Sequence, residues 1–216
     1  MPADKWRWET HTDSKRAGVL GHASFLSIGV DGEETNPVIR GYHMQKTLFC
    51  GVIGPPPKDV DVDEPPPEIE NGRDCKIDRI TANTLTKQGC AVCHQFMEAL
   101  GFGLENYDFR GRYIAHEKDK PECDISGKGK SNTIGSSGGV VNLGNFNSPQ
   151  SLAESLVQSG QISKCMIQRL VEFDIGNKIR NKDPIITKLN DQFSKSESFK
   201  DLVKYYVMLP EYRLRK

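Results

Sequence analysis

The sequence lacks any uninterrupted apolar run approaching the ~20 residues that a membrane-spanning helix requires. It also lacks an excess of either charge, since 29 Lys and Arg side chains balance 29 Asp and Glu side chains. This balance argues against the strongly basic composition of nucleic-acid-binding domains. With 36% hydrophobic and 27% charged residues over 216 positions, the chain is expected to fold as one globular domain or two small ones.

Cysteine is the informative residue in this chain. Cys90-Ala91-Val92-Cys93-His94 has the spacing C-x-x-C-H, and no second Cys/His pair at ligand spacing accompanies it. The absence of such a pair argues against a zinc site. A thioredoxin-like redox pair would follow a strand and needs no histidine. The five residues are the signature of covalent c-type haem attachment, so we predict one haem c.

The spacing within the motif suits this chemistry. Two thiols must add to the two vinyl groups on one side of the porphyrin, and one helical turn places Cys90 and Cys93 on one face. His94 then projects under the ring and supplies a nitrogen to the iron. We therefore predict that Cys90 and Cys93 bind the cofactor and that His94 is a metal ligand.

The other four cysteines, Cys50, Cys75, Cys123 and Cys165, can pair in three ways. We favour Cys50–Cys165 and Cys75–Cys123, and the alternative is that some are free and buried. Haem attachment of this type requires export, yet the chain does not open with a secretory signal. We therefore expect the numbering to describe a mature chain or a fragment of a longer one, in the periplasm or outside a bacterial cell.

Periodicity and turn residues predict a mainly α fold. We expect an N-terminal arm over residues 1–15, a haem-binding domain over 16–148 and a C-terminal helical subdomain over 149–216. A proline-rich linker covers 54–67, and a β-hairpin is expected within 113–127. The expected helices span 16–28, 37–50, 77–88 continuing into the haem-binding helix, 149–158, 161–176, 184–193 and 197–208.

The segment CAVCHQFMEALGFGLENYDFRGRY, residues 90–113, resembles the C-terminal half of the planctomycete-type multidomain cytochromes. Other segments agree in order: Arg16-Ala17-Gly18-Val19-Leu20, Asn36-Pro37-Val38-Ile39-Arg40-Gly41 and Asp124-Ile125-Ser126-Gly127. The resemblance covers nearly all of residues 16–216. It implies haem binding, export and a cytochrome c-like helical fold, and it implies no particular reaction. One departure is Glu98-Ala99, where the family usually has Asp-Pro.

The sixth iron ligand has several candidates, of which we favour His22, with Met44 second. His22 lies between Gly21 and Ala23 on a segment expected to be an apolar helix. The competing interpretation is an ordinary core or surface histidine. Met97 follows His94 on the same helix, so it is expected to pack in the core.

Arg110 and Arg112 are candidates to bind the haem propionates, because Arg recognises carboxylates in a bidentate manner. Salt bridges to Glu105 or Asp108 are the alternative role for these two arginines.

Three functions remain open from the sequence. The first is an electron-transfer domain that works with a redox partner protein or other cytochrome subunits. The second is a peroxidase-like haem enzyme with an open distal position, and the third is a structural or docking subunit of an extracellular assembly. Charge is distributed unevenly, with a net charge of −5 over residues 51–74 and +5 over 161–216. Such runs are usually solvated surface, and the alternative is a docking patch for a redox partner.

Overall fold

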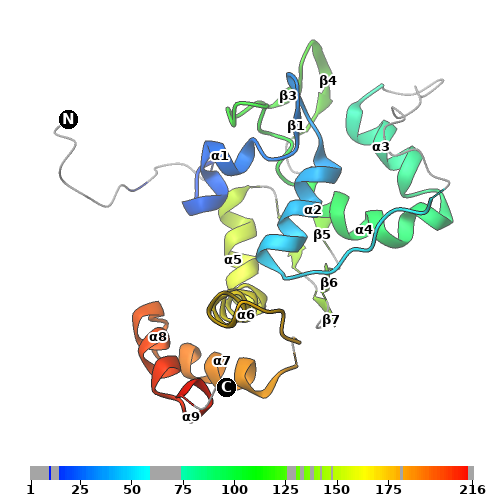
Figure 1. Ribbon diagram of the computed structural model, residues 1–216. Coiled ribbons are helices and arrows are strands. Elements are labelled where there is room, and N and C mark those ends of the chain that lie inside the picture. The colour runs from blue at the N-terminus through cyan, green and yellow to red at the C-terminus, as the bar shows by residue number, and fades with distance from the viewer. Residues whose placement is uncertain are drawn as a thin grey trace.

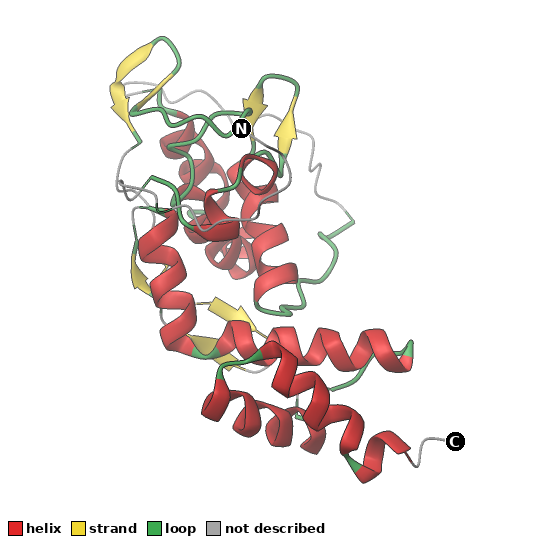
Figure 2. Cartoon of the chain, turned by 90° about the vertical axis from the view of Figure 1, so that its left-hand side faces the viewer, coloured by secondary structure: helices red, strands yellow, loops and turns green. Residues whose placement is uncertain are grey.

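The computed structural model describes residues 10, 15–58, 74–125, 130–131, 134–136, 139–141, 143–146, 148–180 and 182–213. This part of the chain is mainly helical, as predicted, and its strands form four small antiparallel pairs (Figures 1 and 2). The helices are η1 (Gly18–Gly21), α1 (Ala23–Leu26), α2 (Pro37–Leu48), α3 (Lys76–Thr84), α4 (Gln88–Phe102), α5 (Pro149–Ser159), α6 (Gln161–Ile175), α7 (Pro184–Ser196), α8 (Phe199–Met208) and α9 (Pro210–Arg213). The strand pairs are β1 (Val30–Asp31) with β2 (Glu34–Thr35), β3 (His116–Glu117) with β4 (Lys120–Asp124), β5 (Lys130–Ser131) with β8 (Gly144–Asn145), and β6 (Ile134–Ser136) with β7 (Gly139–Val141).

Several predicted elements are found close to their expected bounds. The β3–β4 hairpin lies within 113–127, and α2, α5, α6, α7 and α8 correspond to the predicted helices. Asn36 caps α2 by accepting a hydrogen bond from the backbone N–H of Ile39 at 3.2 Å, and Pro37 occupies the first turn. The predicted linker is irregular and exposed over residues 54–58, and its remainder lies outside the described residues, as does most of the arm.

Two predicted helices are interrupted. The segment expected to be one helix over 16–28 forms η1 and α1, because His22 between them has an extended backbone (φ −76°, ψ 136°). The segment expected to run from residue 77 into the haem-binding helix forms α3 and α4, with Lys87 extended at the break. Thr84 ends α3 and Thr86 lies within the break, and threonine has a low helix propensity.

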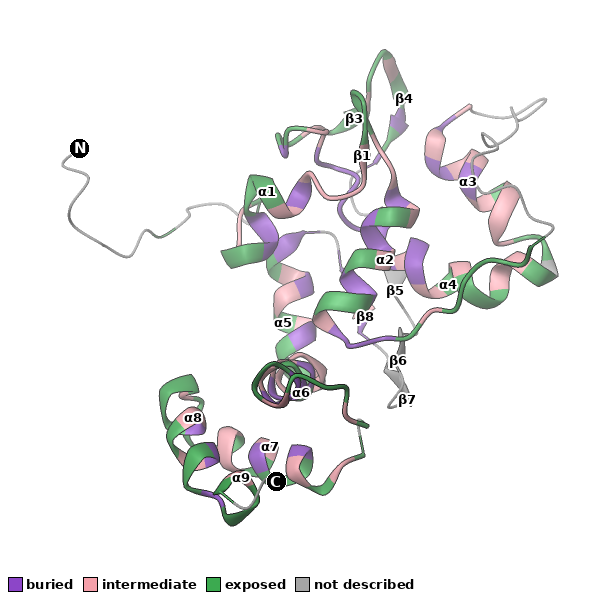
Figure 3. Ribbon diagram, in the orientation of Figure 1, coloured by how far each residue is buried: buried purple, intermediate pink, exposed green. Residues whose placement is uncertain are grey.

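Helices α2 and α4 pack closely because glycine occupies the crossing points. A Cβ atom on Gly41 would lie 1.8 Å from the carbonyl oxygen of Met97, and one on Gly101 would lie 1.9 Å from that of Pro37. Either approach is far inside van der Waals contact, so only glycine permits it. The facing sides of the two helices are buried where they cross (Figure 3).

A buried ion pair ties the end of α4 to α2. Arg40 is 1% exposed, and it donates to the Glu105 carboxylate at 3.0 Å and to the carbonyls of Leu104 and Leu26. Lys76 and Thr35 bind the other oxygen of Glu105. Buried charges are tolerated only when they are paired and hydrogen-bonded in this way.

The buried apolar residues form three clusters. One joins η1, α1, α2, α4 and α5, and a second joins α6 to α9. The third is small and packs α3 against the end of α4 through Ile77, Ile80, Phe102 and Ile125. Because Leu152 and Leu156 of α5 belong to the first cluster, α5 packs with the preceding residues. The division of the chain at 148/149 stays a prediction.

Both predicted disulfides are present. Cys50–Cys165 closes a sequence separation of 115 residues and joins the end of α2 to α6, while Cys75–Cys123 joins the start of α3 to β4. No described helix combines the length and apolar character needed to cross a bilayer.

Candidate haem site

The haem-attachment motif occupies the first turns of α4. Cys90 is half-buried, Cys93 is exposed, and neither takes part in a disulfide. On an α-helix, positions i, i+3 and i+4 share a face, so Cys90, Cys93 and His94 lie on one side of α4. The motif lies on a helix, as predicted.

His94 is held by a carboxylate one turn further along the same helix. Its Nδ1 lies 2.7 Å from Oε1 of Glu98, whose side chain is fully buried. When Glu98 is ionised it can only accept a hydrogen bond, and the proton of this contact then belongs to Nδ1. This tautomer leaves the lone pair of Nε2 free to bind a metal, as in carboxylate–histidine–metal arrangements.

Glu98 has a second neighbour in α3. The hydroxyl of Thr84 lies 2.6 Å from Oε1 of Glu98 and 2.7 Å from the carbonyl oxygen of Ile80. The other oxygen, Oε2, is buried and has no hydrogen-bond partner among the described residues. Because buried carboxylates are costly without partners, His94 and Thr84 must together stabilise this group.

Three contacts hold this arrangement in place. Gln45 of α2 is fully buried and donates its side-chain N–H to the carbonyl of Phe96 at 2.9 Å, which binds α4 to α2 between His94 and Glu98. The start of α3 is held by the Cys75–Cys123 disulfide. The Glu117 carboxylate also accepts the backbone N–H of Lys76 at 2.8 Å. Both helices that meet at Glu98 are therefore anchored.

These residues fit a c-type haem. Two free thiols one turn apart provide the attachment points, and an oriented histidine follows the second thiol directly. Within the described part of the chain, no hydrogen bond engages Nε2 of His94. Donor type, spacing and tautomer all agree with the group that the sequence motif implies.

His22 lies elsewhere in the molecule. It is exposed, caps α1 by accepting from the backbone N–H of Ser24, and its Nδ1 lies 2.8 Å from the hydroxyl of Ser24. In Figure 1, α1 and the beginning of α4 are at opposite edges of the upper part of the molecule, with α2 between them. The structure thus does not bring His22 next to the motif, and its role as sixth ligand stays a prediction.

Arg110 and Arg112 belong to a turn beside α1. Arg112 forms an ion pair with Asp108 at 2.7 Å, which was the alternative role considered from the sequence, and Arg110 stacks on Phe109. The carbonyl of Gly111, between the two arginines, accepts a hydrogen bond from Arg16 just before η1. This turn therefore groups with η1 and α1, and propionate binding by these arginines stays a prediction.

The two methionines considered from the sequence are both buried. Met44 is 1% exposed and belongs to the first hydrophobic cluster, while Met97 is 7% exposed, at the crossing of α4 with α2. Their environments suit core packing.

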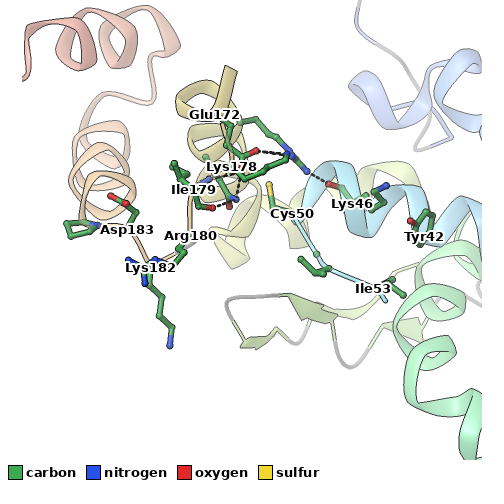
Figure 4. A pocket seen from close by; sticks show the side chains of 15 residues that line it. Tyr42, Lys46, Cys50, Ile53, Glu172, Lys178, Ile179, Arg180, Lys182 and Asp183 are labelled. Atoms are coloured by element: carbon green, nitrogen blue, oxygen red, sulfur yellow. Dashed lines mark hydrogen bonds and ion pairs between the residues drawn. The ribbon is translucent and has the colours of Figure 1, made fainter. Parts of the chain in front are cut away.

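A separate cavity of about 820 Å³ lies between α2 and the segment that joins α6 to α7 (Figure 4). Its lining includes five cationic side chains and two carboxylates: Lys46, Arg169, Lys178, Arg180, Lys182, Glu172 and Asp183. Glu172 already accepts from Arg169 and Lys178 at 3.0 and 2.9 Å. None of the motif residues contributes to this lining, so the cavity is distinct from the haem site.

Sequence reasoning did not assign a role to Glu98 or Thr84. The spacing of His94 and Glu98 by four positions on a predicted helix was a usable signal for their contact. The contact between Thr84 and Glu98 could not be predicted from the sequence, because it depends on the break between α3 and α4.

Residues 16–117, a stretch that includes the whole motif and Glu98, match a family described as PSCyt3, a protein of unknown function (DUF1588). This is the planctomycete cytochrome c-type family, so the match supports a cytochrome-like domain in this part of the chain. No curated protein and no solved structure matches the chain.

Proposed function

We propose that this chain is an exported mono-haem c-type cytochrome domain that transfers electrons to or from a redox partner protein or other cytochrome subunits. The observation that carries the proposal is the first half of α4. There, two free thiols and a histidine with its Nδ1 bound to Glu98 share one side of the helix. The match of residues 16–117 to a cytochrome family supports the same conclusion.

Each residue has a defined role in this proposal. Cys90 and Cys93 would hold the haem through their sulfur atoms, and His94 would bind its iron through Nε2. Glu98 keeps the histidine in the required tautomer and orientation. Haem c, once attached, supplies reversible one-electron exchange, and the protein determines its accessibility and potential.

Export is supported by how the cysteines are used. Four of the six form the pairs Cys50–Cys165 and Cys75–Cys123, and structural disulfides persist in the periplasm and outside the cell. The two motif cysteines stay unpaired, which leaves them available for haem. We therefore place the protein in the bacterial periplasm or outside the cell, within a larger protein or complex.

The decisive experiment is expression in a periplasm equipped for c-type haem maturation. The denatured protein in alkaline pyridine should give a c-type haemochrome, and its mass should exceed that of the polypeptide by one haem. The matched control is Cys90→Ser/Cys93→Ser, which leaves both disulfides intact and should carry no covalent haem. A wild-type protein with the apo mass and two alkylatable thiols at Cys90 and Cys93 would refute the proposal.

Electron transfer is tested separately from attachment. A redox titration of the loaded protein should show one reversible one-electron transition, with low-spin spectra in both oxidation states. A high-spin ferric spectrum with rapid turnover of hydrogen peroxide would instead identify the protein as a haem enzyme.

A further inference from the structure

We propose that Glu98 is a positioning residue that acts through His94 to lower the reduction potential of the attached haem. The inference rests on the proposed function, because it concerns the same site. It goes beyond attachment by naming the side chain that sets the redox property of the domain.

The first argument is the environment of the Glu98 carboxylate. The side chain is fully buried, and its hydrogen-bond neighbours among the described residues are Nδ1 of His94 and the hydroxyl of Thr84. Oε2 has no hydrogen-bond partner in that part of the chain. Few hydrogen-bond donors surround this carboxylate, so an ionised Glu98 interacts mainly with the Nδ1–H of His94.

The second argument is the effect of that charge on a metal-bound imidazole. A hydrogen bond to an ionised acceptor is roughly twice as strong as one to a neutral carbonyl, so it draws the Nδ1 proton further from the ring. The ring becomes a stronger donor at Nε2. A stronger donor favours the ferric state, which carries one more positive charge than the ferrous state.

The third argument concerns distance and surroundings. Glu98 lies one helical turn from His94 and is shielded from water, so its charge acts on the site through a medium of low effective permittivity. Direct attraction to the ferric site therefore adds to the effect through the imidazole. Both effects lower the potential.

A substitution at Thr84 tests the direction in which the reduction potential shifts. The single hydroxyl proton of Thr84 is shared between the carbonyl oxygen of Ile80, at 2.7 Å, and the Glu98 oxygen that His94 also contacts, at 2.6 Å, so it competes with His94 for part of the negative charge. Removing this hydroxyl leaves more of the charge for His94, whereas neutralising Glu98 removes the charge altogether. The two changes must not shift the potential in the same direction if Glu98 acts electrostatically.

The experiment compares midpoint potentials of haem-loaded wild type, Glu98→Gln, Glu98→Asp and Thr84→Val. Glu98→Gln is almost isosteric and keeps an oxygen acceptor. It should shift the Fe(III)/Fe(II) equilibrium at least about tenfold toward Fe(II), which is about +59 mV for one electron. Glu98→Asp retains the charge and should stay closer to the wild type, and Thr84→Val should leave the potential unchanged or lower it.

Resonance Raman spectra after photolysis of the ferrous CO complex give an independent readout. The iron–histidine stretch should lie at a lower frequency in Glu98→Gln than in the wild type, which a merely structural role would not produce. If Glu98→Gln still gives a c-type haemochrome but has the same potential as the wild type, the inference is overturned and the proposed function stands.

A wild type without a haemochrome would instead overturn the proposed function. If Glu98→Gln does not retain haem, Thr84→Val decides: a potential at or below that of the wild type supports the inference, and a raised potential overturns it.

Discussion

Gly41 of α2 faces the backbone of Met97 in α4 so closely that a Cβ atom at Gly41 would lie 1.8 Å from the Met97 carbonyl oxygen. This contact sets the distance between the two helices and lies three residues beyond His94. The packing of the helix that carries the C-x-x-C-H motif therefore depends on glycine at position 41.

Gly41→Ala should destabilise the protein, because α2 and α4 must separate to admit the methyl group. We expect a loss of about 1–3 kcal/mol in the free energy of unfolding, as for overpacked cores generally. Gly89→Ala is the matched control, since a Cβ there meets nothing within 4 Å. It should stabilise α4 by up to about 1 kcal/mol, because alanine is the better helix former. Urea unfolding of both variants checks this, and equal effects would contradict it.

Arg40→Met should be among the most damaging single substitutions. It removes the guanidinium that binds Glu105 and two buried carbonyl oxygens, and breaking a buried pair by removing one partner costs about 3–5 kcal/mol. Thermal or urea unfolding measures the loss. Lys188→Met, which breaks the exposed pair with Glu211, should leave stability unchanged, and a comparable loss there would argue against burial as the cause.

Stability should fall with decreasing pH partly through Glu172. Burial raises the pKa of this carboxyl, but hydrogen bonds from Gln168, Lys178 and the backbone of Ile179 outweigh it and bring the pKa below its ordinary value of 4.5. A group whose pKa is lower in the folded state stabilises the fold above the unfolded pKa, and this contribution is lost as the pH falls through the folded value. The loss should therefore begin near pH 4.5 and continue below it.

The check is the free energy of unfolding as a function of pH for the wild type and Glu172→Gln. The variant should be less stable at pH 7 and should show a shallower decline below pH 4.5. Parallel curves for the two proteins would exclude Glu172 as a contributor.

His22→Ala tests the sequence-based choice of sixth ligand. If His22 is the sixth ligand, as the sequence predicts, the variant should convert the iron of the loaded protein to a high-spin or water-bound form with haem still attached. An unchanged low-spin spectrum would remove His22 from this role. Met44→Leu is the companion variant and should leave the spectrum unchanged, because Met44 packs in the core.

The motif and most of the helices could be predicted from the sequence, because both depend on the spacing of residues that are close together in the chain. Pro37 after Asn36 marks the start of α2, and the five residues of C-x-x-C-H are enough to predict haem attachment. The breaks within helices could not be predicted from the sequence. Residues 16–28 and 77–94 were each expected to be continuously helical, yet His22 and Lys87 adopt extended backbones. Apolar periodicity does not reveal a local cap such as the one that His22 forms with the backbone N–H of Ser24.

The sequence alone predicts that Cys90, Cys93 and His94 form a haem-attachment turn, because the thiol spacing matches one turn of helix. Long-range packing determines what surrounds that turn. Thr84 approaches Glu98 because α3 packs against α4, and the turn that holds Arg112 lies beside η1 because Arg16 donates to the carbonyl of Gly111. Contacts between residues far apart in the chain depend on packing and loop closure, which no local pattern encodes.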